Sequence, residues 1–177
     1  MSLKSERKFQ PVNIAVMTVS DTRRITDDRS GQTLFNRITN AGHNVAAREI
    51  VKDEVSLIVA QLNIWIKSPN IDVVISTGGT GVTGRDVTPE AFSEVYEKEI
   101  TGFGELFRWV SFQKIKTSTI QSRATAGVAG GTYLFALPGS PGACKDGWDE
   151  ILVHQLDIRH SPCNFVELIP RLKEHIT

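Results

Sequence analysis

The sequence predicts a single α/β domain of three layers, α/β/α, with a mostly parallel sheet and a short hairpin. Short β-branched apolar runs alternate with segments whose apolar residues recur at helical spacing. This alternation favours parallel strands, because parallel neighbours need crossover helices and right-handed crossovers place them outside the sheet. The chain has 177 residues, 40% of them hydrophobic, which suits one core. We divide it into a polar N-terminal tail, residues 1–11, and one domain, residues 12–177.

Strand and helix alternate through the first half of the domain. Apolar, β-branched runs predict strands at residues 12–20, 43–51 and 71–77. Between the first two strands, apolar residues at helical spacing predict a helix that ends at Gly42. A second helix of the same kind is predicted over residues 54–67. The loops that follow these strands should therefore share one edge of the sheet.

Two helices are predicted next. The first begins with Thr88 as N-cap and Pro89 at its first position, which is a common pair at helix starts. The second covers residues 103–112, which read FGELFRWVSF and are apolar on more than one helical face. A helix apolar all round has to be covered on several sides.

The last third of the chain predicts a hairpin and two helices. Residues 124–139 read as two short strands joined at residues 130–131, a Gly-Gly pair. Ser140 and Pro141 repeat the cap-then-proline signal and should start a long helix. A short helix near residues 165–173 completes the domain.

Composition excludes several function classes. Twenty basic residues balance twenty acidic ones, so no long-range field favours nucleic acid or an anionic membrane. The N-terminus lacks the apolar core of a signal peptide and no run has membrane-spanning length, so we expect a cytoplasmic protein. The two cysteines and four histidines match no zinc spacing and no nucleophile–histidine pair. Both thiols are therefore interpreted as structural.

Residues 75–90, ISTGGTGVTGRDVTPE, contain a glycine pattern that imitates a dinucleotide site. Gly79, Gly81 and Gly84 satisfy G-x-G-x-x-G. A dinucleotide fold, however, starts its helix inside the motif, whereas the predicted helix begins only at Thr88. A Walker loop is excluded as well, because no Lys-Ser or Lys-Thr closes the glycines. What remains is a loop whose backbone N–H groups can converge on a phosphate.

Two carboxylates lie where they could serve that phosphate. Asp86 stands two residues beyond Gly84 and could bind Mg²⁺, orient a hydroxyl or accept a proton; alternatively it only stabilises a turn or caps the next helix. Asp53 follows the second strand at the same sheet edge, and its alternative role is N-cap of the helix over residues 54–67. Together, the phosphate loop and the two carboxylates favour metal-assisted phosphoryl or nucleotidyl transfer.

Several motifs, spread from about residue 12 to residue 165, together resemble one family. They are TVSD after the first strand, SGQTL, TGGTG with RDVTPE, QSRATAG and LPGSPGAC. In combination they are specific, and they resemble the MoaB/Mog family of molybdenum-cofactor biosynthesis proteins, which is related to the G domain of gephyrin. The segments GFGELFR and SPCNF are more similar to the MoaB branch.

The resemblance implies a molybdopterin-binding fold and, as in Mog-like members, transfer of AMP from Mg-ATP to the terminal phosphate of molybdopterin. The alternative is a non-catalytic molybdopterin carrier or assembly protein of the same pathway. By motif, Asp53 and Asp86 are the catalytic carboxylates, with Asp86 as the magnesium ligand. The implied substrate-binding residues are Ser20, Asp21, Gly78, Gly79, Thr80, Gly81, Thr88, Ser122, Arg123, Pro138, Gly139 and Ser140.

The segment 103–112 also predicts an oligomer. Its apolar side chains cannot all lie on one helical stripe; they are Phe103, Leu106, Phe107, Trp109, Val110 and Phe112. A core within the chain or a symmetric interface could cover the surplus, and a monomer of this size rarely exposes such a patch. The resemblance implies a homo-oligomer, a trimer or a hexamer. Arg108 lies in the patch, and if buried it needs a carboxylate or carbonyl partner across that contact.

Overall fold

The computed structural model describes residues 7–174 and contains one six-stranded sheet, in the order β2-β1-β3-β6-β5-β4. The strands are β1 (Asn13–Val19), β2 (Asn44–Val51), β3 (Val73–Thr77), β4 (Lys98–Glu99), β5 (Thr125–Ala129) and β6 (Thr132–Leu137). Strands β2, β1, β3 and β6 are parallel, whereas β5 and β4 run antiparallel to their neighbours. The predicted α/β class, with a parallel sheet and a β5–β6 hairpin, is confirmed.

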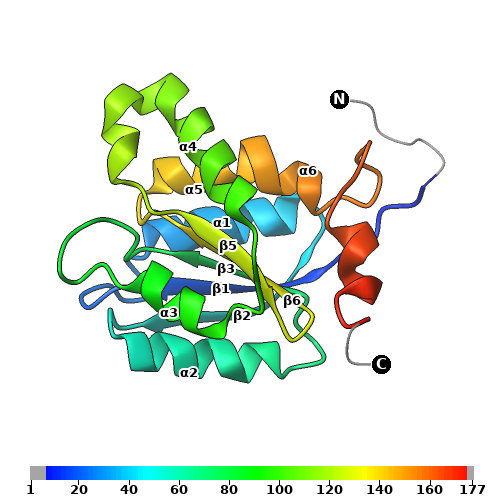
Figure 1. The fold of residues 1–177 in the computed structure, drawn as a ribbon, viewed down its shortest axis with the longest axis horizontal. Coiled ribbons are helices and arrows are strands. Elements are labelled where there is room, and N and C mark those ends of the chain that lie inside the picture. The colour runs from blue at the N-terminus through cyan, green and yellow to red at the C-terminus, as the bar shows by residue number, and fades with distance from the viewer. Residues whose placement is uncertain (1–6, 175–177) are drawn as a thin grey trace.

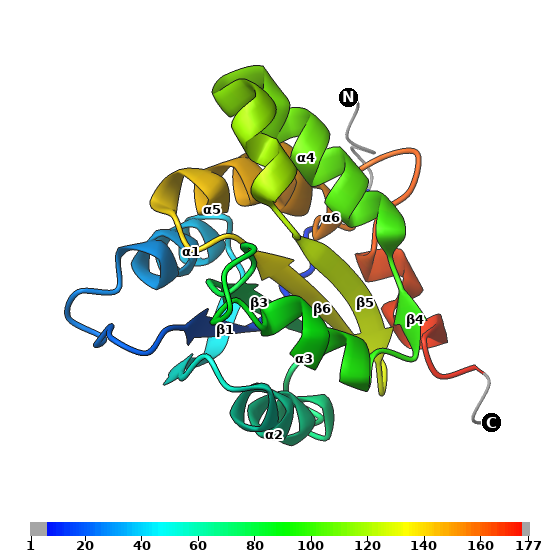
Figure 2. The ribbon, with the colours of Figure 1, turned by 60° about the vertical axis from the view of Figure 1, so that its left-hand side comes forward.

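Helices cover both faces of the sheet, as Figures 1 and 2 show. On one side lie α2 (Val55–Ile66) and α3 (Thr88–Val95), and on the other lie α1 (Arg29–Asn40), α4 (Thr101–Ile115) and α5 (Pro141–Gly147). Each face has its own buried apolar cluster. The layers follow from the sequence, because strands buried on both faces need an apolar helix stripe on each side.

The helical segment after β6 differs in part from the predicted single helix. Ser140 is its N-cap, as predicted, and its Oγ accepts a hydrogen bond from Ala143 N at 3.1 Å. A π-helical turn, η2 (Trp148–Leu152), then separates α5 from α6 (Val153–Gln155). Near the C-terminus the predicted helix is a 3-10 helix, η3 (Val166–Arg171).

The start of α3 is one residue earlier than predicted. Val87 occupies the N-cap position, and Thr88 is the first helical residue. The Thr88 hydroxyl donates to the carbonyl of Gly78 at 2.8 Å, so it ties the helix to the loop after β3 instead of capping the helix. Helix α4 also extends beyond the predicted bounds and continues into a 3-10 helix, η1 (Lys116–Gln121).

Part of the predicted polar tail, residues 1–6, lies outside the described residues. The rest contacts the domain: Arg7 pairs with Glu167, and the Phe9 ring lies 5.0 Å from the ring of His43. Among the helices of residues 7–174, none combines the length and apolar character needed to cross a membrane.

Candidate active site

The loops predicted to carry function lie side by side at one edge of the sheet. Strands β2, β1, β3 and β6 are parallel neighbours, so their carboxyl ends face the same way. Asp53 follows β2, Asp21 follows β1, the glycine loop begins at Gly78 after β3, and Pro138 follows β6. Four segments distant in sequence are thereby brought into one crevice, the usual ligand position in such sheets.

The glycine loop adopts a backbone that requires glycine. Gly78 and Gly79 have φ of 109° and 63°, in the left-handed region that other residues rarely adopt. A Cβ at Gly78 would lie 2.2 Å from the carbonyl oxygen of Val19, and one at Gly79 would lie 2.4 Å from Thr88 Oγ1. The absence of side chains therefore allows this loop to pack closely against Val19 and Thr88. It also leaves backbone groups of the loop without side chains to cover them.

Asp86 points back at the glycine loop. Its Oδ2 accepts hydrogen bonds from Thr83 N at 2.8 Å and Thr83 Oγ1 at 2.6 Å. Burial opposes ionisation, but the bonds from Thr83 and Gly81 and the charge of Arg123 outweigh it and lower the pKa of Asp86. The turn role considered for Asp86 is therefore present, and it holds an ionised carboxylate beside Gly81.

Asp53 lies against the glycine loop at Gly79. The N-cap of α2 is Glu54, with no side-chain hydrogen bond, so the capping alternative for Asp53 is wrong. Asp53 Oδ1 would be 3.0 Å from a Cβ at Gly79, which places its carboxylate against the loop. Burial and the charge of Asp21 raise the pKa of Asp53. The two carboxylates predicted to be catalytic therefore border the same loop, Asp53 at Gly79 and Asp86 at Gly81.

The guanidinium of Arg85 lies near the carboxylates of Asp21 and Asp53. Arg85 binds Asp21 in a bidentate pair, with Nε–Oδ2 and Nη2–Oδ1 distances of 2.9 and 2.8 Å. The Asp53 N–H donates to Asp21 Oδ1 at 3.3 Å. The hydrogen bond from Arg85 lowers the pKa of Asp21. Arg85 was not predicted as a site residue, although it belongs to the RDVTPE motif.

A cavity of about 370 Å³ borders the glycine loop, and neither Asp53 nor Asp21 is among its lining residues. The predicted residues that line it are Gly79, Thr80, Gly81, Asp86, Ser122, Pro138, Gly139 and Ser140. Its far wall comes from α4 and η1 and is rich in polar side chains, among them Ser111, Ser118, Thr119 and Gln121. The remaining predicted residues, Ser20, Asp21, Asp53, Gly78, Thr88 and Arg123, lie outside this wall. The crevice therefore has two parts, this cavity and the acidic rim at Asp53 and Asp21, and both border the glycine loop.

Several predicted substrate contacts use their polar groups within the protein. Ser20 Oγ accepts from the backbone N–H of Arg23 at 3.2 Å, and Ser122 Oγ accepts from Ala124 N at 3.4 Å. Arg23, which was not predicted, donates to the carbonyl of Gly139 at 3.0 Å. These bonds fix the loops that line the crevice.

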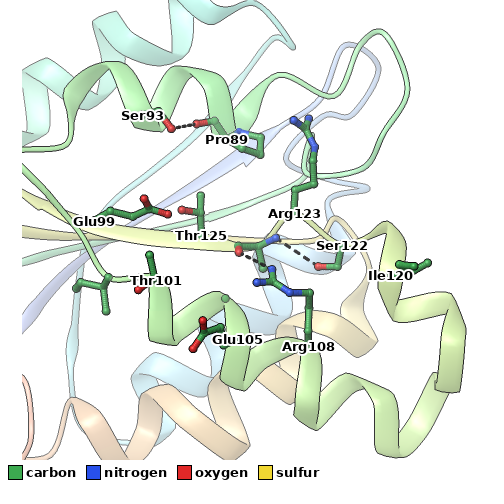
Figure 3. Close-up of a pocket in the computed structure, with 13 residues that line it drawn as sticks. Pro89, Ser93, Glu99, Thr101, Glu105, Arg108, Ile120, Ser122, Arg123 and Thr125 are labelled. Atoms are coloured by element: carbon green, nitrogen blue, oxygen red, sulfur yellow. Dashed lines mark hydrogen bonds between the residues drawn. The ribbon is translucent and has the colours of Figure 1, made fainter.

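A larger hollow, about 630 Å³, lies between α3 and α4 (Figure 3). Glu99, Glu105 and Arg108 are among its lining residues, but neither Asp53 nor Asp86 is. The hollow also lacks the residues of the glycine loop. Since a phosphate-transfer site needs backbone donors and carboxylates together, chemistry favours the smaller cavity despite its lesser volume.

Residues 15–158 match a family described as a probable molybdopterin binding domain. The chain belongs to this family. Among curated family relatives, molybdenum cofactor biosynthesis protein B of Escherichia coli K12 is 49% identical over 158 residues, covering 89% of this chain and 93% of the relative.

Solved structures of the family agree. A crystal structure of a molybdenum cofactor biosynthesis protein B has a TM-score of 0.85 at 36% identity, covering 95% of this chain and 99% of that one. The tungsten cofactor synthesizing protein MoaB from Pyrococcus furiosus has a TM-score of 0.72 at 32% identity, with 94% and 97% covered. The resemblance to the MoaB branch of the family is confirmed.

Neither Cys144 nor Cys163 lines the cavity beside the glycine loop. Burial raises the pKa of Cys144 to about 11, and its thiol contacts Thr77 Oγ1 at 3.1 Å, as expected of a structural thiol. Cys163 is exposed, and neither cysteine of the described chain forms a disulfide. Within residues 7–174, no three His, Cys, Asp or Glu side chains gather into a ready-made metal site. Mg²⁺ fits Asp53 and Asp86 nonetheless, since it commonly takes one or two carboxylates plus substrate phosphates.

Proposed function

We propose that this protein acts in molybdenum-cofactor biosynthesis by binding molybdopterin and transferring AMP to its terminal phosphate from Mg-ATP. The observation that supports the proposal is the pair of carboxylates, Asp53 and Asp86, beside a glycine loop whose bare backbone suits a phosphate. The family and the names of its relatives support the pathway.

The two parts of the crevice suggest a place for each substrate. We place molybdopterin in the 370 Å³ cavity, where Ser111, Thr119 and Gln121 offer hydrogen bonds to a polar heterocycle. The nucleotide phosphates then lie across the glycine loop, beside Asp53 and Arg85. Because Arg85 is a bidentate donor on the crevice rim, it can exchange Asp21 for a phosphate. This arrangement brings the two phosphates together at the loop.

The reaction asks the protein for alignment and charge balance. A terminal phosphate oxygen of molybdopterin forms a bond to the α-phosphorus of ATP, while the bond to the leaving pyrophosphate breaks. Backbone N–H groups of the glycine loop would stabilise the negative charge at this centre. Asp53 and Asp86 would hold Mg²⁺, which when bound neutralises charge on the phosphates. Neither carboxylate has to form a covalent intermediate.

A single-turnover assay tests the proposed function. Protein in excess over labelled ATP, with Mg²⁺ and molybdopterin, is expected to yield adenylylated molybdopterin and one pyrophosphate per product. Omission of molybdopterin and chelation of Mg²⁺ are the controls. Binding of molybdopterin without an adenylylated product would instead establish the carrier function.

The apolar segment on α4 is divided between core and surface. Phe103, Phe107 and Val110 are buried, as a core within the chain requires. A second set is exposed at three-residue spacing: Leu106 at 45%, Trp109 at 64%, Phe112 at 43% and Ile115 at 52%. Arg108 donates to the carbonyl of Ala124 in the same chain at 3.3 Å, so it does not need a partner across a contact. Only the second set calls for an external cover.

We propose that this exposed stripe lies in a homo-oligomer, a trimer or a hexamer. Light scattering at micromolar concentration is expected to give a multiple of three times the 19.5 kDa chain mass. Trp109→Glu should shift the mass toward the monomer, because a charge would be buried without a partner. Lys145→Glu, an exposed change on α5, is the control. A wild-type mass of one chain would contradict the proposal.

A further inference from the structure

Arg123 makes an unusual set of hydrogen bonds around the glycine loop. Its Nε donates to the carbonyl of Gly81 at 2.6 Å and its Nη2 donates to the carbonyl of Asp86 at 2.6 Å. Gly81 and Asp86 are the two ends of the segment 81–86, whose middle residues are exposed. A single planar guanidinium therefore ties both ends of this segment together.

The remaining edge of the guanidinium is also occupied. Arg123 Nη1 forms an ion pair with Glu90 on α3, and the Arg123 backbone N–H donates to Thr80 O at 2.9 Å. Figure 3 shows the side chain pointing toward the start of α3 and away from Arg108. Each of the three guanidinium nitrogens therefore has a partner within the protein. The side chain is poorly placed to bind a substrate phosphate as well.

We propose that Arg123 is a positioning residue, which holds the segment 81–86 so that the Asp86 carboxylate keeps its place beside the glycine amides. This differs from the role of substrate ligand implied by the family resemblance. Its catalytic consequence rests on the proposed function, whereas its effect on the segment does not. Arginine is required because two carbonyls must be bound by one rigid fork.

The variant Arg123→Lys tests whether the two directed hydrogen bonds of the guanidinium matter, apart from its positive charge. Lysine keeps the positive charge near Glu90, but a single ammonium cannot reproduce the two directed bonds to Gly81 and Asp86. The matched control is Arg37→Lys, which removes a bidentate arginine pair with Asp149 on the opposite layer. Both variants preserve net charge, so a difference between them reports the fork at Arg123.

The first readout needs no activity. Trypsin cleavage of the Arg85–Asp86 bond, followed by mass spectrometry, is expected to be about fivefold or more faster in Arg123→Lys than in wild type or Arg37→Lys. The rate at Arg24, which lies in another exposed loop, should not change. An unchanged cleavage rate at Arg85 would overturn the proposed role of Arg123. An equal rise at Arg85 and Arg24 would overturn it too, because it would report a general loss of stability.

The second readout distinguishes positioning from binding. In Arg123→Lys, kcat for AMP transfer is expected to fall about tenfold or more, with KM for molybdopterin within about twofold of wild type. A raised KM with an unchanged kcat would make Arg123 a substrate ligand and overturn the inference. If wild type transfers no AMP, the proposed function fails, and the trypsin result alone decides whether Arg123 holds the segment.

Discussion

Asp86→Asn is expected to lower kcat for AMP transfer by about a hundredfold or more, the scale of losing a charge-stabilising group. Asparagine keeps a carbonyl oxygen that can accept the hydrogen bonds from Thr83, so the turn should survive. What is lost is the negative charge beside Gly81. Affinity for molybdopterin should stay within a few-fold, because most of the cavity wall is unchanged.

The measurement combines turnover, molybdopterin binding and thermal unfolding on one preparation. Asp149→Asn is the matched control, since it removes an exposed carboxylate that pairs with Arg37, and neither residue lines the cavity. Unchanged turnover in Asp86→Asn would reduce Asp86 to a turn residue. A fall in turnover that is matched by a large fall in the unfolding temperature would also favour the structural role.

The sheet edge could be predicted because local signals and topology agree there. Alternating strands and helices require parallel strands, and parallel strands bring the loops after residues 19, 51, 77 and 137 to one edge. Ser140 shows the same agreement, since its sequence signal of N-cap before proline is realised as a cap on α5. Asp53 and Asp86 could be placed at the loop for this reason alone.

The features that could not be predicted are mostly the partners of polar side chains, which the fold decides. Thr88 has the sequence signal of an N-cap, yet Gly78 offers its hydroxyl a carbonyl, and Val87 takes the cap position. Arg85 and Asp21 are 64 residues apart, so their pairing appears only in three dimensions. The π-helical turn at Trp148 likewise has no local signal in a segment whose apolar spacing fits a regular helix.

The far wall of the cavity shows the same limit. Part of it comes from η1, whose sequence KTSTIQ has no apolar period and lies outside the helix predicted over residues 103–112. Ser118 and Gln121 face the cavity only because α4 extends far enough to carry η1 over the glycine loop. The residues of the glycine loop could therefore be predicted from the sequence, whereas the residues of the far wall depend on where α4 ends and η1 begins.

Gly78→Ala is expected to lower the free energy of unfolding by about 3 kcal/mol or more, the upper range for single substitutions. Gly78 has a φ of 109°, and its new Cβ would lie 2.2 Å from the Val19 carbonyl oxygen, a backbone atom of β1 that no side-chain rotation can move.

The matched control is Gly84→Ala in the same loop, where a Cβ meets no atom within 4 Å and φ is not positive, so stability should change by less than about 0.5 kcal/mol. Urea unfolding of both variants at one protein concentration measures the difference, because the proposed assembly would make stability depend on concentration. Equal midpoints for the two variants would mean that the loop after β3 can shift away from β1, and that stability does not require glycine at position 78.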